Sequence, residues 1–204
     1  MISRCLSLFI FLNCLFGASL VWANSSQALY QTCTACHGEK GQGNKALNAP
    51  SLIGQQPWYI ESQLKAFKSQ LRGEHPDDEL GKQMLAVVSP LTTKEISLLA
   101  QYISEFEPKN NDKSLVKTGK GFSAYQARCG ACHGSDGKGN DAFKAPNLTQ
   151  LSPEYIQRQM DNFVQGKRGY KMSDKLGRQM AMMAKSVPDK ELRLILAFLN
   201  QPAD

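Results

Sequence analysis

Two copies of one short pattern decide the fold of this 204-residue chain: Cys33-Thr34-Ala35-Cys36-His37-Gly38 and Cys129-Gly130-Ala131-Cys132-His133-Gly134. In each copy a pair of cysteines brackets two residues and a histidine follows at once, which is the attachment pattern of covalently bound c-type haem. The thiols add to the vinyl groups of one porphyrin, and the histidine is placed to bind the iron. The sequence therefore predicts two covalently attached haem c groups. Cys33, Cys36, Cys129 and Cys132 would hold the porphyrins, and His37 and His133 would bind the iron atoms.

The N-terminus has the pattern of an export signal. Met1-Ile2-Ser3-Arg4 leads into an apolar run from Cys5 to about Leu20, and Val21-Trp22-Ala23 follows. A basic start, a short apolar run and a small-X-small site are typical of a secretory signal peptide. The run is shorter than the ~20 residues of a membrane-spanning helix, so an uncleaved anchor is the weaker alternative. We expect cleavage after Ala23 and a soluble mature chain in the periplasm.

The chain has no cysteine left for a structural disulfide. Of its six cysteines, Cys5 and Cys14 would leave with the signal peptide and the other four belong to the haem motifs. Neither Cys5 nor Cys14 has the small residues before it that a lipoprotein signal needs. A lipid anchor is therefore not expected.

The two motifs belong to an internal repeat with a constant offset of 96 positions, the separation of Cys33 and Cys129. The same offset joins pairs far from the motifs, such as Tyr59 with Tyr155 and Phe67 with Phe163. A repeat without gaps over most of the mature chain indicates one small fold built twice. We expect a signal peptide over 1–23, a first domain over 24–108, a polar linker over 109–119 and a second domain over 120–204.

Each half has the periodicity of helices and no alternating strand pattern. Pro57 opens a segment with Ile60, Leu64, Phe67 and Leu71 on one face, Pro153 opens its counterpart, and Gly73 and Gly169 lie past the expected ends. Thr92 and Glu95 have the spacing of a capping box for a further helix, whose counterpart starts near Pro188. Another helix precedes each haem motif. The sequence therefore predicts an all-α fold of two tandem helical domains.

Each haem iron of an electron carrier needs a second axial ligand. After His37 the first half contains one methionine, Met84, whereas the second half has five, which their own surroundings do not separate: Met160, Met172, Met180, Met182 and Met183. The offset pairs Met84 with Met180, and both follow a Gly-basic-Gln sequence at the same distance from a haem histidine. We predict these two as the ligands, and core packing for Met160, Met182 and Met183. His75 is expected to be an exposed imidazole.

Pro50 and Pro146 lie between each haem histidine and the next helix. A proline carbonyl there could accept the histidine N–H and fix the ring, although an ordinary rigid turn explains these prolines equally well. The glycine-rich loops 38–43 and 134–139 lack the flanking strand and the Lys-Ser end of a nucleotide-binding loop. We expect their glycines to let the backbone pass close to the haem.

In these motifs and their spacing, the chain resembles two class I cytochrome c domains in tandem, as in the dihaem cytochrome c4 family of periplasmic electron carriers. The resemblance covers nearly all of residues 24–204. It implies that Cys33, Cys36, Cys129 and Cys132 bind haem, and that His37 and His133 are the proximal ligands. It also implies Met84 and Met180 as distal ligands and Pro50 and Pro146 as the residues that orient the histidines. The family relays electrons toward terminal oxidases, in some members with loose attachment to the membrane.

Charge is distributed unevenly between the halves. Residues 24–113 contain nine Lys and Arg against ten Asp and Glu, net −1, whereas residues 114–204 contain fourteen against eight, net +6. The contrast is concentrated in two corresponding loops, one with Glu74, Asp77, Asp78 and Glu79, the other with Lys167, Arg168, Lys171, Lys175 and Arg178. We expect the basic loop to dock an acidic patch on a redox partner, such as a terminal oxidase or a quinol-oxidising complex. A solvated basic face is the alternative, and nothing indicates nucleic-acid binding.

Filled axial positions predict a one-electron carrier that is not an enzyme. A dihaem peroxidase would need one haem with a vacant or displaceable distal position, which the matched methionines oppose. A haem subunit of a larger periplasmic dehydrogenase is the alternative that the sequence leaves open. A four-cysteine zinc module would leave the two histidines, the export signal and the paired methionines unexplained.

Overall fold

The computed structural model describes residues 26–107 and 115–201. Within these residues the chain is helical, with two isolated β-bridges and no strand, so the predicted all-α class is confirmed. None of the helices in this part of the chain is long and apolar enough to cross a bilayer. The signal peptide 1–23, its cleavage after Ala23 and residues 109–114 of the linker lie outside the described residues. The domain boundaries therefore stay predictions.

The first domain consists of four helices. Residues 26–37 form the helix that carries the first haem motif. It is followed by α2 (Pro57–Lys68), α3 (Glu79–Val88) and α4 (Thr93–Ser104). Helix α2 packs on both α3 and α4. Ile60 of α2, Leu99 and Ile103 of α4 and Tyr30 of the first helix form the main apolar cluster, so the haem-bearing helix is fixed to the rest of the domain by packing.

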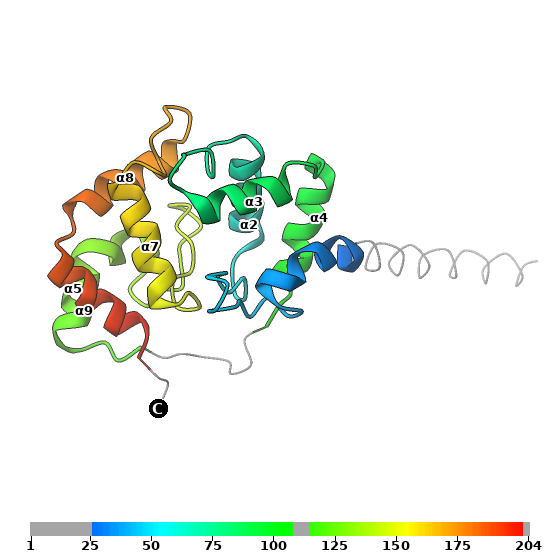
Figure 1. Cartoon of the computed structure of the whole chain (residues 1–204). Helices are drawn as coiled ribbons and strands as arrows, with labels where there is room; N and C mark the ends of the chain where they lie inside the picture. The colour runs from blue at the N-terminus through cyan, green and yellow to red at the C-terminus, as the bar shows by residue number, and fades with distance from the viewer. Residues whose placement is uncertain (1–25, 108–114, 202–204) are drawn as a thin grey trace, which may run out of the picture.

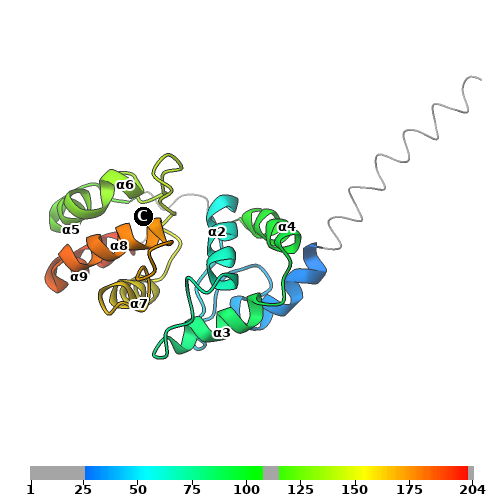
Figure 2. The ribbon, with the colours of Figure 1, turned by 90° about the horizontal axis from the view of Figure 1, so that it is seen from above.

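The second domain repeats this arrangement beside the first (Figures 1 and 2). Its haem-bearing helix is built of α5 (Gly119–Tyr125), the π-helical turn η1 (Gln126–Gly130) and α6 (Ala131–His133). Helices α7 (Pro153–Val164), α8 (Lys175–Ser186) and α9 (Asp189–Leu199) follow. Helix α5 packs on α9, and α7 on α8 and α9, around Tyr125, Phe198 and Leu199.

Local signals set the helix ends. The capping box is confirmed, since the Thr92 hydroxyl accepts from the Glu95 N–H and the Glu95 carboxylate accepts from the Thr92 N–H. Proline stands at the first helical position of α2 and of α7, where its missing N–H costs nothing. Helix α2 ends before Gln70, which has a left-handed φ of 59°, so the expected end near Gly73 was placed too late. Gly166, the counterpart of Gln70, has a φ of 73°.

Gly73 and Gly169 have another role, which the sequence did not indicate. A Cβ atom on Gly73 would lie 2.3 Å from the carbonyl oxygen of Gly81 in α3, and one on Gly169 would lie 2.2 Å from that of Gly177 in α8. Both residues also have positive φ values, 78° and 69°. Glycine is therefore needed where the loop crosses against the helix that carries Met84 or Met180. Helices α3 and α8 themselves were not predicted.

The repeat has one gap, ahead of the second haem motif. The Tyr30 hydroxyl donates to the Gly38 carbonyl at 2.7 Å, and the Tyr125 hydroxyl donates to the Gly134 carbonyl at 2.8 Å. These equivalent bonds span eight residues in the first domain and nine in the second. The additional residue is absorbed by the π-helical turn Gln126–Gly130, as a single-residue insertion in an α-helix usually is. The predicted gap-free offset therefore fails upstream of Cys129.

The two domains meet through contacts related by a pseudo-two-fold axis. Trp58 of the first domain donates to Asp141 of the second. The repeat pairs Trp58 with Glu154 and Asp141 with Lys45, and these two counterparts also meet across the boundary, as a salt bridge. An interface in which residue i meets residue j and the equivalent of j meets the equivalent of i is isologous, as in a symmetric dimer. The chain therefore holds its two haem motifs in a dimer-like pair of domains.

Candidate haem sites

Each haem histidine is buried and hydrogen-bonded to a proline carbonyl. His37 and His133 are 5% and 6% exposed, and Nδ1 of each lies 2.9 Å from the carbonyl oxygen of Pro50 or Pro146. That oxygen can only accept, so Nδ1 carries the proton and Nε2 keeps its lone pair. Nε2 has no hydrogen-bond partner among the described residues. Both rings are thus arranged as a metal-bound imidazole with its orienting acceptor.

Burial also keeps these rings neutral. It lowers the pKa of His37 and of His133 below the usual histidine value, and it outweighs the opposite effect of the proline carbonyl, which favours the protonated ring. A neutral imidazole is the form that binds a metal ion.

The glycine-rich loops bring the proline carbonyls to the histidines. The Gly43 N–H donates to the His37 carbonyl at 2.8 Å, and the Leu52 N–H donates to the Gly41 carbonyl at 2.7 Å. A Cβ atom on Gly43 would lie 2.7 Å from the backbone nitrogen of Ser51. Only glycine therefore fits at position 43 of this loop. Gly139, with the same positive φ, is its counterpart in the second domain. The glycines thus allow a close approach of backbone to backbone beside the haem histidine.

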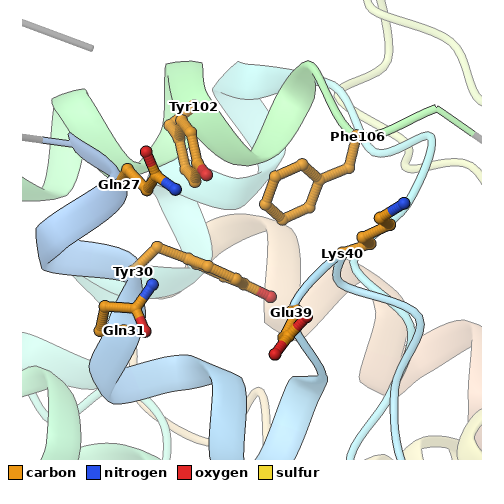
Figure 3. Close-up of a pocket in the computed structure, with 7 residues that line it drawn as sticks. All are labelled: Gln27, Tyr30, Gln31, Glu39, Lys40, Tyr102 and Phe106. Atoms are coloured by element: carbon orange, nitrogen blue, oxygen red, sulfur yellow. The ribbon is translucent and has the colours of Figure 1, made fainter. Parts of the chain in front are cut away.

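Aromatic packing holds the first haem motif in place. Figure 3 shows the Tyr30 ring beside Tyr102 and Phe106 of the C-terminal part of the domain, with centroid separations of 5.7 Å and 4.9 Å. Tyr30 lies one helical turn before Cys33 and also bonds to Gly38, directly after His37. The Tyr30 side chain therefore links the backbone directly after the motif to Tyr102 of α4 and to Phe106 just beyond that helix.

A pocket of about 440 Å³ opens beside this aromatic cluster (Figure 3). Its lining residues are Gln27, Tyr30, Gln31, Glu39, Lys40, Tyr102 and Phe106. It includes none of the predicted haem-binding residues. The pocket therefore lies outside the candidate sites.

The four motif cysteines are free thiols rather than a disulfide. Burial, and after it the nearby Cys36, raises the pKa of Cys33 to about 11. Burial, and after it Cys132, raises the pKa of Cys129 to about 11. Cys33 and Cys129 are therefore neutral thiols at pH 7, and the described residues contain no cysteine outside the two motifs.

The predicted distal methionines occupy equivalent positions. Met84 lies in α3 and Met180 in α8, and both are half-buried. Met84 packs against the apolar cluster that contains Phe67 of α2, and Met180 packs against the cluster that contains Phe163 of α7. Met160 packs into the core, as expected. The expectation for Met182 and Met183 was wrong, because their side chains are 67% and 39% exposed. They point away from the buried face of α8, which is formed by Gly177, Ala181 and Ala184.

Two arginines are buried where the domains meet. Arg72 and Arg168 are 7% and 8% exposed, and each donates to both Gln63 and Gln159, at 2.5 to 3.2 Å. Each also stacks on the phenylalanine of its own domain, with 4.4 Å to the ring centroid. Burial, followed by the charge of Arg72, lowers the pKa of Arg168 to about 10, so the group stays charged at neutral pH. The two guanidinium groups thus share the same two glutamine side chains as acceptors. Nε of Arg72 has no hydrogen-bond partner in the described structure.

This cluster corrects the predicted basic docking loop. Arg168 is buried at the domain boundary, and Lys171 forms a salt bridge with Glu74 of the opposite loop. Tyr170 donates to Glu74 as well, and its ring lies 6.3 Å from that of His75, which is half-buried rather than exposed. The acidic loop and the basic loop were expected to form two separate surfaces of opposite charge. They instead bind one another, because the pseudo-two-fold axis brings corresponding loops together.

The donor set fits a haem iron in each domain. A neutral, oriented imidazole, the two thiols of the same motif and a half-buried thioether in the same domain are the kinds of group that a six-coordinate c-type haem requires. The haem-binding residues stay predictions from the sequence. The arginine cluster was missed because only the fold brings Arg72 and Arg168 together. Their shared offset of 96 was the one available signal.

Comparison with known proteins finds the same family along nearly the whole chain. The family model "Cytochrome c" matches twice, at residues 23–107 and 119–202. The cytochrome c4 of Thiocapsa roseopersicina is 30% identical over 82% of this chain and 85% of its own length. The crystal structure of cytochrome c4 from Pseudomonas stutzeri matches 87% of this chain and 96% of its own, with a TM-score of 0.69 at 24% identity, which supports the fold.

Two further relatives are named by their redox context. The "thiosulfate dehydrogenase electron acceptor" of Thiomonas intermedia is 28% identical over 82% of this chain and 77% of its own length. The "Cbb3-type cytochrome c oxidase subunit FixP" of Azorhizobium caulinodans is 33% identical over 64% of this chain, which corresponds to 44% of that subunit.

Proposed function

The chain belongs to the cytochrome c family and, within it, to the dihaem cytochromes c4, and from that premise we propose that it carries single electrons in the periplasm between respiratory partners, toward a terminal oxidase. It binds two covalently attached haem c groups, one in each domain. The observation that carries the proposal is the repeated His–Pro hydrogen bond together with a methionine at the equivalent place in both domains.

Each side chain has a defined task in this proposal. Cys33 and Cys36, like Cys129 and Cys132, hold the porphyrin through thioether bonds. His37 and His133 bind iron through Nε2 while the carbonyls of Pro50 and Pro146 accept the Nδ1 proton and fix the rings. Met84 and Met180 would hold the iron through their thioether sulfurs. Haem bound in this way supplies a one-electron couple between ferric and ferrous iron.

The protein environment favours a carrier with high potentials. A neutral thioether ligand stabilises ferrous iron relative to a second histidine, and an apolar surrounding disfavours the additional charge of the ferric state. The buried guanidinium groups of Arg72 and Arg168, whose hydrogen bonds go to amides, fit the anionic carboxylates of haem. If a histidine and a methionine both hold each iron, peroxide would find no place to bind, so we propose an electron carrier that is not an enzyme.

The direction of electron flow is supported by relatives rather than by geometry. The likeness to an oxidase subunit favours delivery to a terminal oxidase. The likeness to an electron acceptor of thiosulfate dehydrogenase favours the second candidate, a haem-carrying partner or subunit of a periplasmic dehydrogenase.

Two experiments test the proposal. Fully coordinated haems should neither bind carbon monoxide in the ferrous state nor turn over peroxide, and a ligand-binding haem would favour the peroxidase alternative instead. Affinity purification of the native protein distinguishes the remaining candidates: a free carrier elutes alone, whereas a dehydrogenase subunit brings a second chain in stoichiometric amount.

A further inference from the structure

The exposed face of α8 has cations that neither the fold nor the domain boundary uses. Lys175, Arg178 and Lys185 are all exposed, and none of them forms a salt bridge within the described residues. They are spaced three and seven positions apart, so they lie along one side of the helix. Met182, 67% exposed, lies between them on that side. The result is a row of positive charges with an apolar centre.

Two of these charges, Lys175 and Arg178, oppose the stability of their own helix, whereas Lys185 lies in its last turn, where a cation is favoured. The N-terminal end of a helix carries partial positive charge, which favours acidic residues and disfavours basic ones. Helix α8 begins at Lys175 and has no acidic residue in its first turn, whereas the equivalent helix α3 begins with Glu79. Asp174 caps α8 by accepting from the Gly177 N–H but forms no salt bridge with these cations in the described structure. A cost in stability at this place indicates a use outside the fold.

Other cations of the second domain are already engaged. Arg168 is buried between the domains, Lys171 is paired with Glu74, and Arg128 is paired with Glu191. Lys190 and Arg193 of α9 are exposed as well, but they stand among the acidic residues Asp189 and Glu191, whereas the first turn of α8 contains no acidic residue.

We propose that the α8 face, defined as Lys175, Arg178, Met182 and Lys185, is the surface on which an acidic redox protein docks. The inference rests on the proposed carrier function and specifies the partner by its chemistry: a surface rich in carboxylates around an apolar centre. Cations that are not paired within the chain attract such a surface and raise the association rate, and the flexible thioether of Met182 adapts to its apolar part. Met180 projects from the opposite side of α8. A protein docked here lies about 10–12 Å, one helix diameter, from that proposed ligand.

A pair of matched charge reversals tests this surface. The double variant Lys175→Glu and Arg178→Glu removes the α8 cations, and the double variant Lys190→Glu and Arg193→Glu is its control on α9. Both pairs are exposed, have the same spacing, lie in the first five residues of a helix and change the net charge equally. The probe for the acidic partner is a gold electrode coated with a carboxylate-terminated alkanethiol monolayer. The measured quantity is the electron-transfer rate of the adsorbed mature dihaem protein at low and high ionic strength.

The expected result is a fall of about tenfold or more for the α8 variant at low ionic strength, with the α9 variant close to wild type. Equal losses in both variants would show that only net charge matters, and unchanged rates in both would show that neither helix docks; either result overturns the proposal. A redox titration of all three proteins in solution separates this from a failure of the carrier function. If all three proteins titrate normally and their electrode rates are equal, only the docking surface is contradicted. If a haem fails to change oxidation state in all three proteins, the proposed carrier function is contradicted.

Discussion

At the scale of single residues, one hydrogen bond decides which nitrogen of each haem histidine remains for iron. Because the Pro50 and Pro146 carbonyls take the Nδ1 protons, Nε2 is left as the donor in both domains. The role of the methionines is less constrained, since Met84 and Met180 are half-buried residues on helices that also carry apolar core residues. Substitution separates a ligand from a packing residue.

Met180→Ala should remove the distal ligand of one haem and leave the other unchanged. We expect one of the two haems to lose its methionine-to-iron charge-transfer band and to titrate at a lower potential. Met182→Ala, two residues further along the same helix and exposed, is the control and should change neither haem. Optical redox titration measures both properties, and two unaltered bands in Met180→Ala would exclude this residue as a ligand.

Tyr30→Phe should lower the free energy of unfolding by about 1 kcal/mol, because the Gly38 carbonyl loses its bond from the Tyr30 hydroxyl at 2.7 Å and keeps only the bond from the Gly41 N–H at 3.2 Å. Tyr102→Phe, in the same aromatic cluster, is the control, since no hydrogen bond from its hydroxyl occurs in the described structure. Denaturant unfolding of both variants provides the comparison. Equal midpoints would mean that packing, rather than the hydrogen bond, fixes Tyr30.

At the scale of elements, the π-helical turn shows how far the sequence could be interpreted. The apolar periodicity predicted α2, α4, α7 and α9, and the capping box and the prolines marked their starts. Helices α3 (10 residues) and α8 (12 residues) were not predicted, although they are about as long as the helices that were, because these two segments were interpreted only as sources of haem ligands. The single-residue insertion was invisible as well, because the motif cysteines keep the offset of 96 on its C-terminal side and only the tyrosine bonds reveal the shift.

Deletion of Gln126 should be tolerated. It gives the second haem-bearing helix the tyrosine-to-cysteine spacing of the first, which forms a regular α-helix. Deletion of Gln31 from the first helix should instead rotate Tyr30 by roughly 100° relative to Cys33 and break its bond to Gly38. The melting temperature and the number of haems incorporated per chain distinguish the two deletions. Equal damage by both would mean that the π-helical turn is itself required.

At the scale of the whole molecule, the isologous boundary turns two small domains into one unit. Gln63 and Gln159 each accept from both buried arginines, so each arginine would lose one of these two hydrogen bonds if the domains separated. The sequence predicted the charge asymmetry between the halves correctly but placed Arg168 and Lys171 on a free surface. The residue pattern of one domain contains no information on which loops face each other across the axis.

Gln159→Leu should weaken this boundary by about 1–3 kcal/mol, because both guanidinium groups lose an acceptor while they remain buried. Gln157→Leu is the matched control on α7, since Gln157 bonds only within its own helix, to Asp161. Calorimetry should show one cooperative transition for wild type and control, and two separate transitions for Gln159→Leu. A single transition at the wild-type temperature in that variant would mean that the arginine cluster does not couple the domains.

The central claim is that both domains carry a haem with histidine and methionine ligands. A spectroelectrochemical titration of the exported, mature protein tests it most directly, with haem content per chain and the ferric methionine-to-iron charge-transfer band measured together. We predict two low-spin haems, both with the band and both at high potential. A high-spin or low-potential haem in either domain would show that Met84 or Met180 is not bound, and would contradict the proposal of a pure electron carrier.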